Sequence, residues 1–185
     1  MSKRTIKYIV IVLLSLASVL FGMRERFSPE VKKNTESPAK GSVRVEKVYD
    51  GDTVSVVLGG RTEKLRLIGI DAPENGQRPW GKRSKEHLQE IISKGSWNVV
   101  LEYDVVKRDK YERLLVYLRT PDGRLINEMM VRDGYAVLFT FPPNVRYADL
   151  FTRAQKEARE KMLGIWGKNG LRQAPSDYRK QHPRY

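Results

Sequence analysis

The chain contains no cysteine, which excludes disulfide bonds and thiolate metal sites. It has only two histidines, His87 and His182, and this argues against a zinc site built on imidazole. Acidic residues are also scarce: 22 Asp and Glu stand against 35 Lys and Arg, and the formal net charge is +13. Such a balance favours an anionic partner, which could be nucleic acid, an anionic cell-surface polymer or a membrane face.

Residues 1–23 have the layout of a secretory signal or an N-terminal membrane anchor. Lys3, Arg4 and Lys7 precede an uncharged run over residues 8–23 that is rich in Val, Ile and Leu. A positively charged amino end favours the cytoplasmic side, so we expect the rest of the chain outside the membrane. The sequence therefore predicts an exported protein. It is either secreted or tethered to the outer face of the cytoplasmic membrane by this segment, which would then contact the membrane.

Composition divides the remaining chain into three parts. Residues 24–41 are polar and include prolines, serines and several lysines, which is typical of a flexible linker. Residues 42–167 carry the apolar periodicities of one folded domain, large enough to bury a core without disulfides. Residues 168–185 form a basic C-terminal tail. We expect a monomer.

The periodicities within the domain predict five strands and about three helices. A Gly-Gly pair at 59–60 between two alternating segments indicates a hairpin. The expected strands begin near residue 43 and then cover 53–58, 61–68, 97–103 and 114–119; the expected helices cover 80–93, 126–133 and 147–162. This order predicts an α+β protein, mainly β, with a five-stranded OB-fold barrel packed against the helices.

Three carboxylates are expected to meet at the open end of the hairpin. The hairpin folds residues 50–74 in half and brings Asp52 toward Asp71 and Glu74, with Arg66 on the strand between them. Because like charges repel, a fold that gathers carboxylates usually holds a cation or moves a proton. The plainer alternative is that the acids are turn residues and that Arg66 lies on a solvated strand face.

Six short motifs, occurring in order, resemble those of the staphylococcal-nuclease-like, or thermonuclease, family. They are DGDT at 50–53, RLIGIDAPE at 66–74, DKYER at 109–113, NE at 127–128, VRDG at 131–134 and GIW at 164–166. The resemblance covers about residues 43–166. It implies an OB-fold with three helices and a calcium-dependent endonuclease that hydrolyses phosphodiester bonds of DNA and RNA. The expected products carry 3′-phosphate and 5′-hydroxyl ends.

The resemblance also implies how the acidic motif residues act. Asp52, Asp71 and the carbonyl of Ala72 would bind the calcium ion. Asp50 would stabilise these ligands without binding the ion itself. Glu74 would be the general base that takes a proton from the attacking water. Oxygen ligands of this kind suit a hard cation such as calcium.

Basic and aromatic motif residues would contact the substrate. Arg66 and Arg113 would bind the phosphate, since a planar guanidinium donates two parallel hydrogen bonds and stays charged. The residues expected to contact the nucleotide are Lys110, Tyr111, Phe139 and Phe141. Both phenylalanines stand where the family has tyrosines, which keeps the stacking faces but loses the hydroxyl groups. From the residues alone, the phenylalanines could equally belong to the core.

Glu112 departs from the family pattern, which has glycine before the arginine. If its φ is positive, a residue other than glycine costs about 1 kcal/mol there. Its carboxylate could also compete for Arg113. This departure is the main argument for the alternative function, a non-catalytic OB-fold module that binds nucleic acid or another polyanion.

Overall fold

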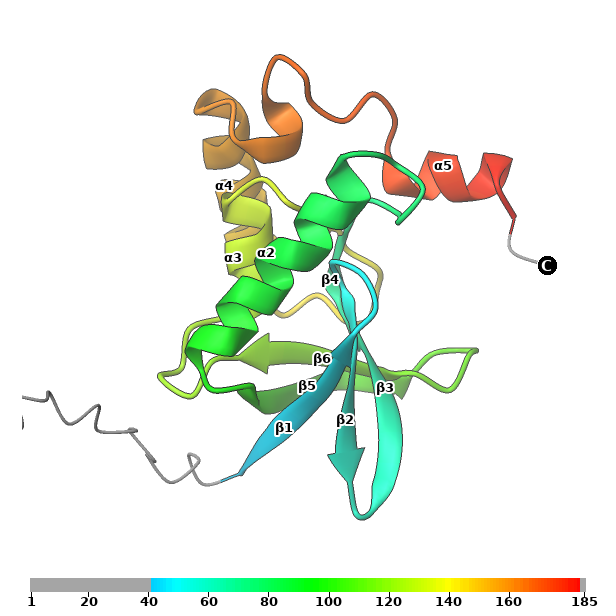
Figure 1. Ribbon diagram of the computed structural model, residues 1–185, viewed down its shortest axis with the longest axis vertical. Helices are drawn as coiled ribbons and strands as arrows, with labels where there is room; N and C mark the ends of the chain where they lie inside the picture. The colour runs from blue at the N-terminus through cyan, green and yellow to red at the C-terminus, as the bar shows by residue number, and fades with distance from the viewer. Residues whose placement is uncertain (1–40, 184–185) are drawn as a thin grey trace, which may run out of the picture. The chain divides into compact units, whose positions relative to one another are not determined.

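The computed structural model of the protein describes residues 41–183 (Figure 1). The segment expected to be a signal or anchor, residues 1–23, lies outside the described residues, and so does nearly all of the linker. Within residues 41–183, no helix has both the length and the apolar character needed to cross a bilayer.

Five strands form a closed barrel in the order β1-β2-β3-β6-β5. Their bounds are β1 Ser42–Val48, β2 Thr53–Leu58, β3 Arg61–Leu67, β5 Asn98–Arg108 and β6 Leu114–Arg119. Neighbouring strands run antiparallel except β3 and β6, which are parallel, and pairing of β1 with β5 closes the barrel. The prediction of a five-stranded barrel in a mainly β protein is confirmed.

The barrel interior follows the alternation that predicted the strands. Val54 and Val56 of β2, Leu65 and Leu67 of β3 and Val116 of β6 are all completely buried. Since side chains two residues apart point to the same face of a strand, these residues form one continuous apolar interior. The interior fixes the register of the hairpin, because a slip by one residue would turn this set outward.

Three helices pack against the barrel, as predicted, and the structure adds a fourth. The predicted helices correspond to α2 Trp80–Lys94, α3 Ile126–Arg132 and α4 Ala148–Glu160, which Figure 1 shows together at one end of the barrel. A short 3-10 helix, η1, follows at Gly164–Trp166. The addition is α5, Pro175–Gln181, in the segment that the sequence marked only as a basic tail.

The chain turns sharply after β3, and this turn positions part of the site. Gly69 has φ +80°, and a Cβ atom there would lie 2.3 Å from the ring of Phe151 in α4, so only glycine fits. From this turn, β4 (Gly69–Asp71) leaves the barrel and pairs with β7 (Val137–Phe139). The small two-stranded sheet places Asp71 and Phe139 at its opposite ends.

Strand β5 is longer than predicted and continues from Tyr103 to Arg108. The sequence indicated a loop here because charged residues interrupt the apolar alternation. The strand nevertheless resumes its pairing with β6 where Arg108 meets Leu114, after an irregularity in register. The remaining loop is short, from 109 to 113, and it leads into β6 where Leu114 pairs with Leu65 of β3.

Candidate active site

Arg66 joins the two carboxylates that were expected to converge. Antiparallel pairing of Thr53 with Arg66 brings Asp52 beside that side chain, and β4 delivers Asp71 from the other direction. Nη2 of Arg66 lies 3.2 Å from Oδ2 of Asp52 and 3.1 Å from Oδ1 of Asp71. Nη1 donates to the carbonyls of Leu67 and of Ile70, the latter at 2.9 Å. One guanidinium therefore holds both acids and the turn between β3 and β4.

The acids are buried in a network of backbone hydrogen bonds. Oδ2 of Asp52 accepts from the backbone N–H of Ala72 at 2.8 Å, and Oδ1 of Asp50 accepts from that of Asp52 at 3.0 Å. Burial, reinforced by the neighbouring Asp52, raises the pKa of Asp50 to about 6. Burial also raises the pKa of Asp71, although Arg179 and Arg66 oppose the shift. Asp50 thus holds the backbone of Asp52 and also lines the pocket described below, while its supporting role at a metal site stays a prediction.

Glu74 joins the acidic group through a residue that the sequence did not single out. Arg179, in α5, donates from Nη1 to Oδ1 of Asp71 and to Oε1 of Glu74, both at 2.9 Å. Its Nη2 donates to Oδ2 of Asp71, also at 2.9 Å. Nothing in the sequence distinguishes Arg179 from its basic neighbours Arg172 and Lys180, because the contact joins residues more than 100 positions apart.

The donor chemistry of the acids suits a hard cation, although two guanidinium groups now contact them. Among residues 41–183, no group of three or more His, Cys, Asp or Glu side chains is arranged to hold a metal ion as it stands. The acids present oxygen atoms only, and a cation, the Arg179 guanidinium, already lies between Asp71 and Glu74. The residues therefore fit a divalent ion with oxygen ligands once that guanidinium has moved.

The loop at 109–113 brings a third arginine and an aromatic ring to the site. Oδ2 of Asp109 accepts from Nε of Arg113 at 2.7 Å, and Oδ1 accepts from the backbone N–H groups of Tyr111 and Arg113. The ring of Tyr111 is exposed, with Nζ of Lys110 5.0 Å and the Arg113 guanidinium 5.6 Å from its centre. Asp109, to which the motif alone assigned no role, holds this loop together through these hydrogen bonds.

Glu112 has φ +61°, the conformation for which the sequence predicted a strain cost. Its carbonyl accepts from Arg108, and the carboxylate that pairs with Arg113 belongs to Asp109 instead.

Because an L-residue costs about 1–2 kcal/mol in this region and glycine costs about 0.5–1 kcal/mol in chain entropy, Glu112→Gly should raise the free energy of unfolding by about 0.5 kcal/mol. Urea unfolding would measure it. Lys110→Gly, where φ is not positive, is the control and should lower stability; a loss in both variants would contradict the prediction.

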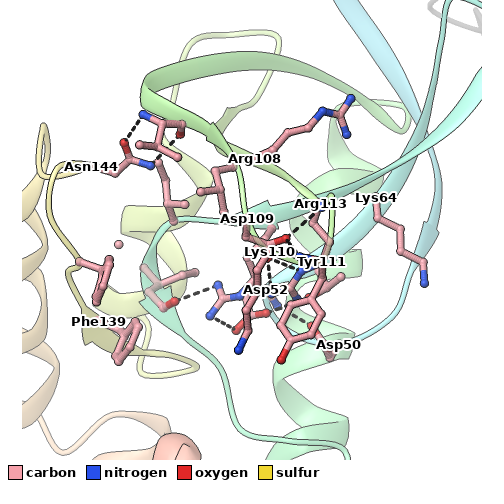
Figure 2. A pocket seen from close by; sticks show the side chains of 18 of the residues that line it. Asp50, Asp52, Lys64, Arg108, Asp109, Lys110, Tyr111, Arg113, Phe139 and Asn144 are labelled. Carbon is pink, nitrogen blue, oxygen red and sulfur yellow. Dashed lines mark hydrogen bonds and ion pairs between the residues drawn. The ribbon is translucent and has the colours of Figure 1, made fainter.

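Most of these residues, but not Asp71 or Glu112, line one open pocket, shown in Figure 2. Asp52, Tyr111 and Arg113 lie on one side of it, and Phe139 lies on the other. Phe139 and Phe141 are 43% and 73% exposed, so they face the pocket and solvent and are not core residues. Further residues that the sequence did not predict also line it, namely Tyr49, Lys64, Arg108, Asn144, Arg179 and His182.

Comparison with known proteins agrees with this geometry. The family described as staphylococcal nuclease homologue matches residues 64–168. The thermonuclease of Staphylococcus intermedius is 32% identical over 163 residues, which cover 85% of this chain and 95% of that protein.

Two endonucleases of Bacillus subtilis are also similar. The SPbeta prophage-derived endonuclease YokF is 34% identical over 135 residues, and endonuclease YncB is 32% identical over 136. The matches cover 69% and 70% of this chain but only 45% of YokF and 63% of YncB. The family model covers Arg66, the turn at Gly69, Asp71 and Arg113, and the thermonuclease match covers most of the chain; the chain belongs to the staphylococcal nuclease family.

Proposed function

We propose that this protein is an exported, monomeric, calcium-dependent nuclease that hydrolyses phosphodiester bonds within DNA and RNA chains and leaves 3′-phosphate and 5′-hydroxyl ends. The observation that carries the proposal is the pairing of Asp52 and Asp71 on the guanidinium of Arg66, which together with Asp52 lines an open pocket of basic and aromatic side chains. The nuclease names of the relatives support the reaction class.

Asp52 and Asp71 would hold the calcium ion, together with the carbonyl of Ala72. Calcium bound by oxygen ligands would polarise the phosphate and favour ionisation of a bound water. The protein's own contribution is to fix these ligands: Arg66 orients both carboxylates, and the N–H of Ala72 orients Asp52. Such fixed charges stabilise the charge that develops on the phosphate in the transition state.

Glu74 would act as the general base. It lies three residues beyond Asp71, after the rigid Pro73, and its carboxylate shares the Arg179 guanidinium with Asp71. The backbone N–H of Glu74 donates to Oε1 of Gln77 at 2.9 Å, which fixes the loop that carries it. A carboxylate held this close to the metal ligands can accept the proton of an attacking water.

The rest of the pocket would bind the nucleic acid. Arg113 would donate to the phosphate oxygens, as would Nε of Arg66, whose two Nη groups are already engaged, and Lys110 would add a cation at the rim. Exposed aromatic rings of Tyr111, Phe139 and Phe141 would stack on bases, which tolerates any sequence. The pocket is open, so a strand can pass through it without a free end, and this favours cleavage inside the chain.

Removal of calcium is expected to abolish cleavage. Full-length protein in mild detergent would be mixed with circular single-stranded DNA, with calcium and then with excess chelator. With calcium the circle should be cut, and with chelator cutting should fall by at least about 100-fold, because the metal stabilises the transition-state charge. Readdition of calcium is the control and should restore the rate. Binding of DNA without any cutting would favour the non-catalytic polyanion-binding module instead.

Export is part of the proposal and rests on the composition of residues 1–23. Fractionation of a bacterium that expresses the full chain would locate the protein in the medium, on the outer face of the membrane or in the cytoplasm. We expect either of the first two locations. Protein confined to the cytoplasm would contradict export but would not affect the proposed chemistry.

A further inference from the structure

The C-terminal helix α5 places a cation of the protein itself on Asp71, one of the residues proposed to bind the metal ion. Arg179 forms a forked pair with both oxygens of Asp71, whose side chain is 1% exposed, and reaches Glu74 with the same Nη1 atom. Paired, charge-assisted hydrogen bonds of this kind are among the strongest in proteins. These contacts hold α5 against the acidic group.

Arg179 and a metal ion cannot share these ligands. Oδ1 of Asp71 accepts from Arg66 and Arg179, and Oδ2 accepts from Arg179, so the guanidinium covers the side from which an ion would approach. A divalent ion bound to Asp71 would also lie within a few ångströms of the guanidinium charge and would repel it. Arg66 also contacts Asp71, but two backbone carbonyls hold it in place, whereas the contacts of Arg179 are with the acids themselves. Binding of the ion therefore requires Arg179 to leave.

The segment before α5 is fixed to the domain without any help from Arg179. Leu171 N–H donates to the carbonyl of Ile165 at 2.9 Å, Trp80 Nε1 donates to that of Asn169 at 3.1 Å, and Gln77 Nε2 donates to that of Gln173 at 2.9 Å. These anchors keep α5 next to the pocket. Its return to the acids is then an intramolecular step with a high effective concentration.

Helix α5 itself is only weakly held. It has seven residues, of which only Pro175 is buried, and isolated helices of this length are marginal in water. Outside Arg179 and the buried Pro175, a close packing contact is made by the Tyr178 ring on Gly76, where an added Cβ would lie 2.3 Å from the hydroxyl oxygen. A helix with firm anchors before it and few contacts of its own can detach while the domain stays folded.

We propose that α5 is an autoinhibitory latch: Arg179 covers the metal ligand Asp71 and pairs with Glu74 in the metal-free protein, and it leaves when a divalent ion binds. This inference rests on the metal site proposed above. The latch gives the chain a closed state with paired acids and an open state that is competent for metal and substrate. Metal affinity is then reduced by the fraction of molecules in which the latch is closed.

Calcium titration by calorimetry, without nucleic acid, tests the latch directly. Full-length wild type, Arg179→Gln and Lys180→Gln would be compared, since Lys180 is exposed, lies on the same helix and loses the same charge. We expect Arg179→Gln to bind calcium about tenfold more tightly than wild type, and Lys180→Gln to stay within about twofold. Equal affinity of wild type and Arg179→Gln would overturn the latch and leave the metal site intact. Absence of calcium binding in both would overturn the metal site and the latch together.

Hydrogen exchange on the wild-type protein gives a second test that needs no variant. The backbone N–H groups of Tyr178 and His182 donate to the carbonyls of Ala174 and Tyr178. Their exchange rates therefore report whether α5 keeps its helical hydrogen bonds, which we expect to be lost when the helix detaches. Saturating calcium should speed their exchange by about tenfold or more, while amides in α2 stay protected. A difference in calcium affinity can also arise from charge repulsion between Arg179 and the ion. A faster exchange of the Tyr178 and His182 amides requires displacement of α5. Unchanged or slower exchange of α5 with calcium bound would overturn the proposal.

Discussion

Arg66→Lys is expected to lower the rate of nucleic acid cleavage by about 100- to 1,000-fold, the range seen when one transition-state donor is removed. The guanidinium of Arg66 makes four contacts at once: Nη1 with two backbone carbonyls and Nη2 with Asp52 and Asp71. A lysine ammonium keeps the charge but lacks the planar fork, so it cannot hold both acids and the turn together. The loss should appear mainly in kcat, because misplaced ligands weaken the transition state more than substrate binding.

The matched control for this variant is Arg61→Lys. Arg61 begins the same strand, is exposed and lies outside the pocket, so the same change of side chain should leave the cleavage rate within about twofold. Circular dichroism should show the same fold for both variants. Wild-type activity in Arg66→Lys would show that the forked contact is not needed and would remove the basis of the proposed site.

Asn127→Ala is expected to lower the free energy of unfolding by about 3 kcal/mol. Asn127 is completely buried at the start of α3. Its Oδ1 accepts from the backbone N–H of Leu118 at 2.9 Å, and its Nδ2 donates to the carbonyl of Ile68 at 2.8 Å. The amide therefore ties β6 to the chain just before the turn at Gly69. Alanine is a good helix former, so the expected loss comes from the two buried backbone groups that lose a partner.

Asn98→Ala provides the control for this loss of stability. Its amide also donates to a backbone carbonyl, that of Ser96 at 3.2 Å, but the contact is exposed to water. We expect this variant to stay within about 0.5 kcal/mol of wild type, because water replaces the lost partner. Urea unfolding of the metal-free proteins would measure both. If Asn127→Ala lowered the free energy of unfolding by less than about 1 kcal/mol, the hydrogen bonds of Asn127 to Leu118 and Ile68 would not be important for stability.

Local pattern was sufficient to predict most of the barrel. The alternation of Val54, Val56, Leu65 and Leu67, together with the Gly-Gly turn, determined the hairpin, because periodicity and turn chemistry act over a few residues. Because such patterns act only over a few residues, they did not predict the extension of β5 to Arg108. Its charged side chains break the local pattern, and only pairing with β6 makes that segment a strand.

Motifs in the sequence identified most of the acidic and basic residues of the site and their likeness to one nuclease family. Asp52, Asp71 and Arg66 lie within 20 residues of one another, so a hairpin and a turn are enough to bring them together. Which partners they take was decided only by the tertiary structure. Arg113 pairs with Asp109 and not with Glu112, and Arg179 enters the acidic group from a helix more than 100 residues away. The Arg179 contact depends on where the folded chain places distant segments, and no local pattern of residues encodes it.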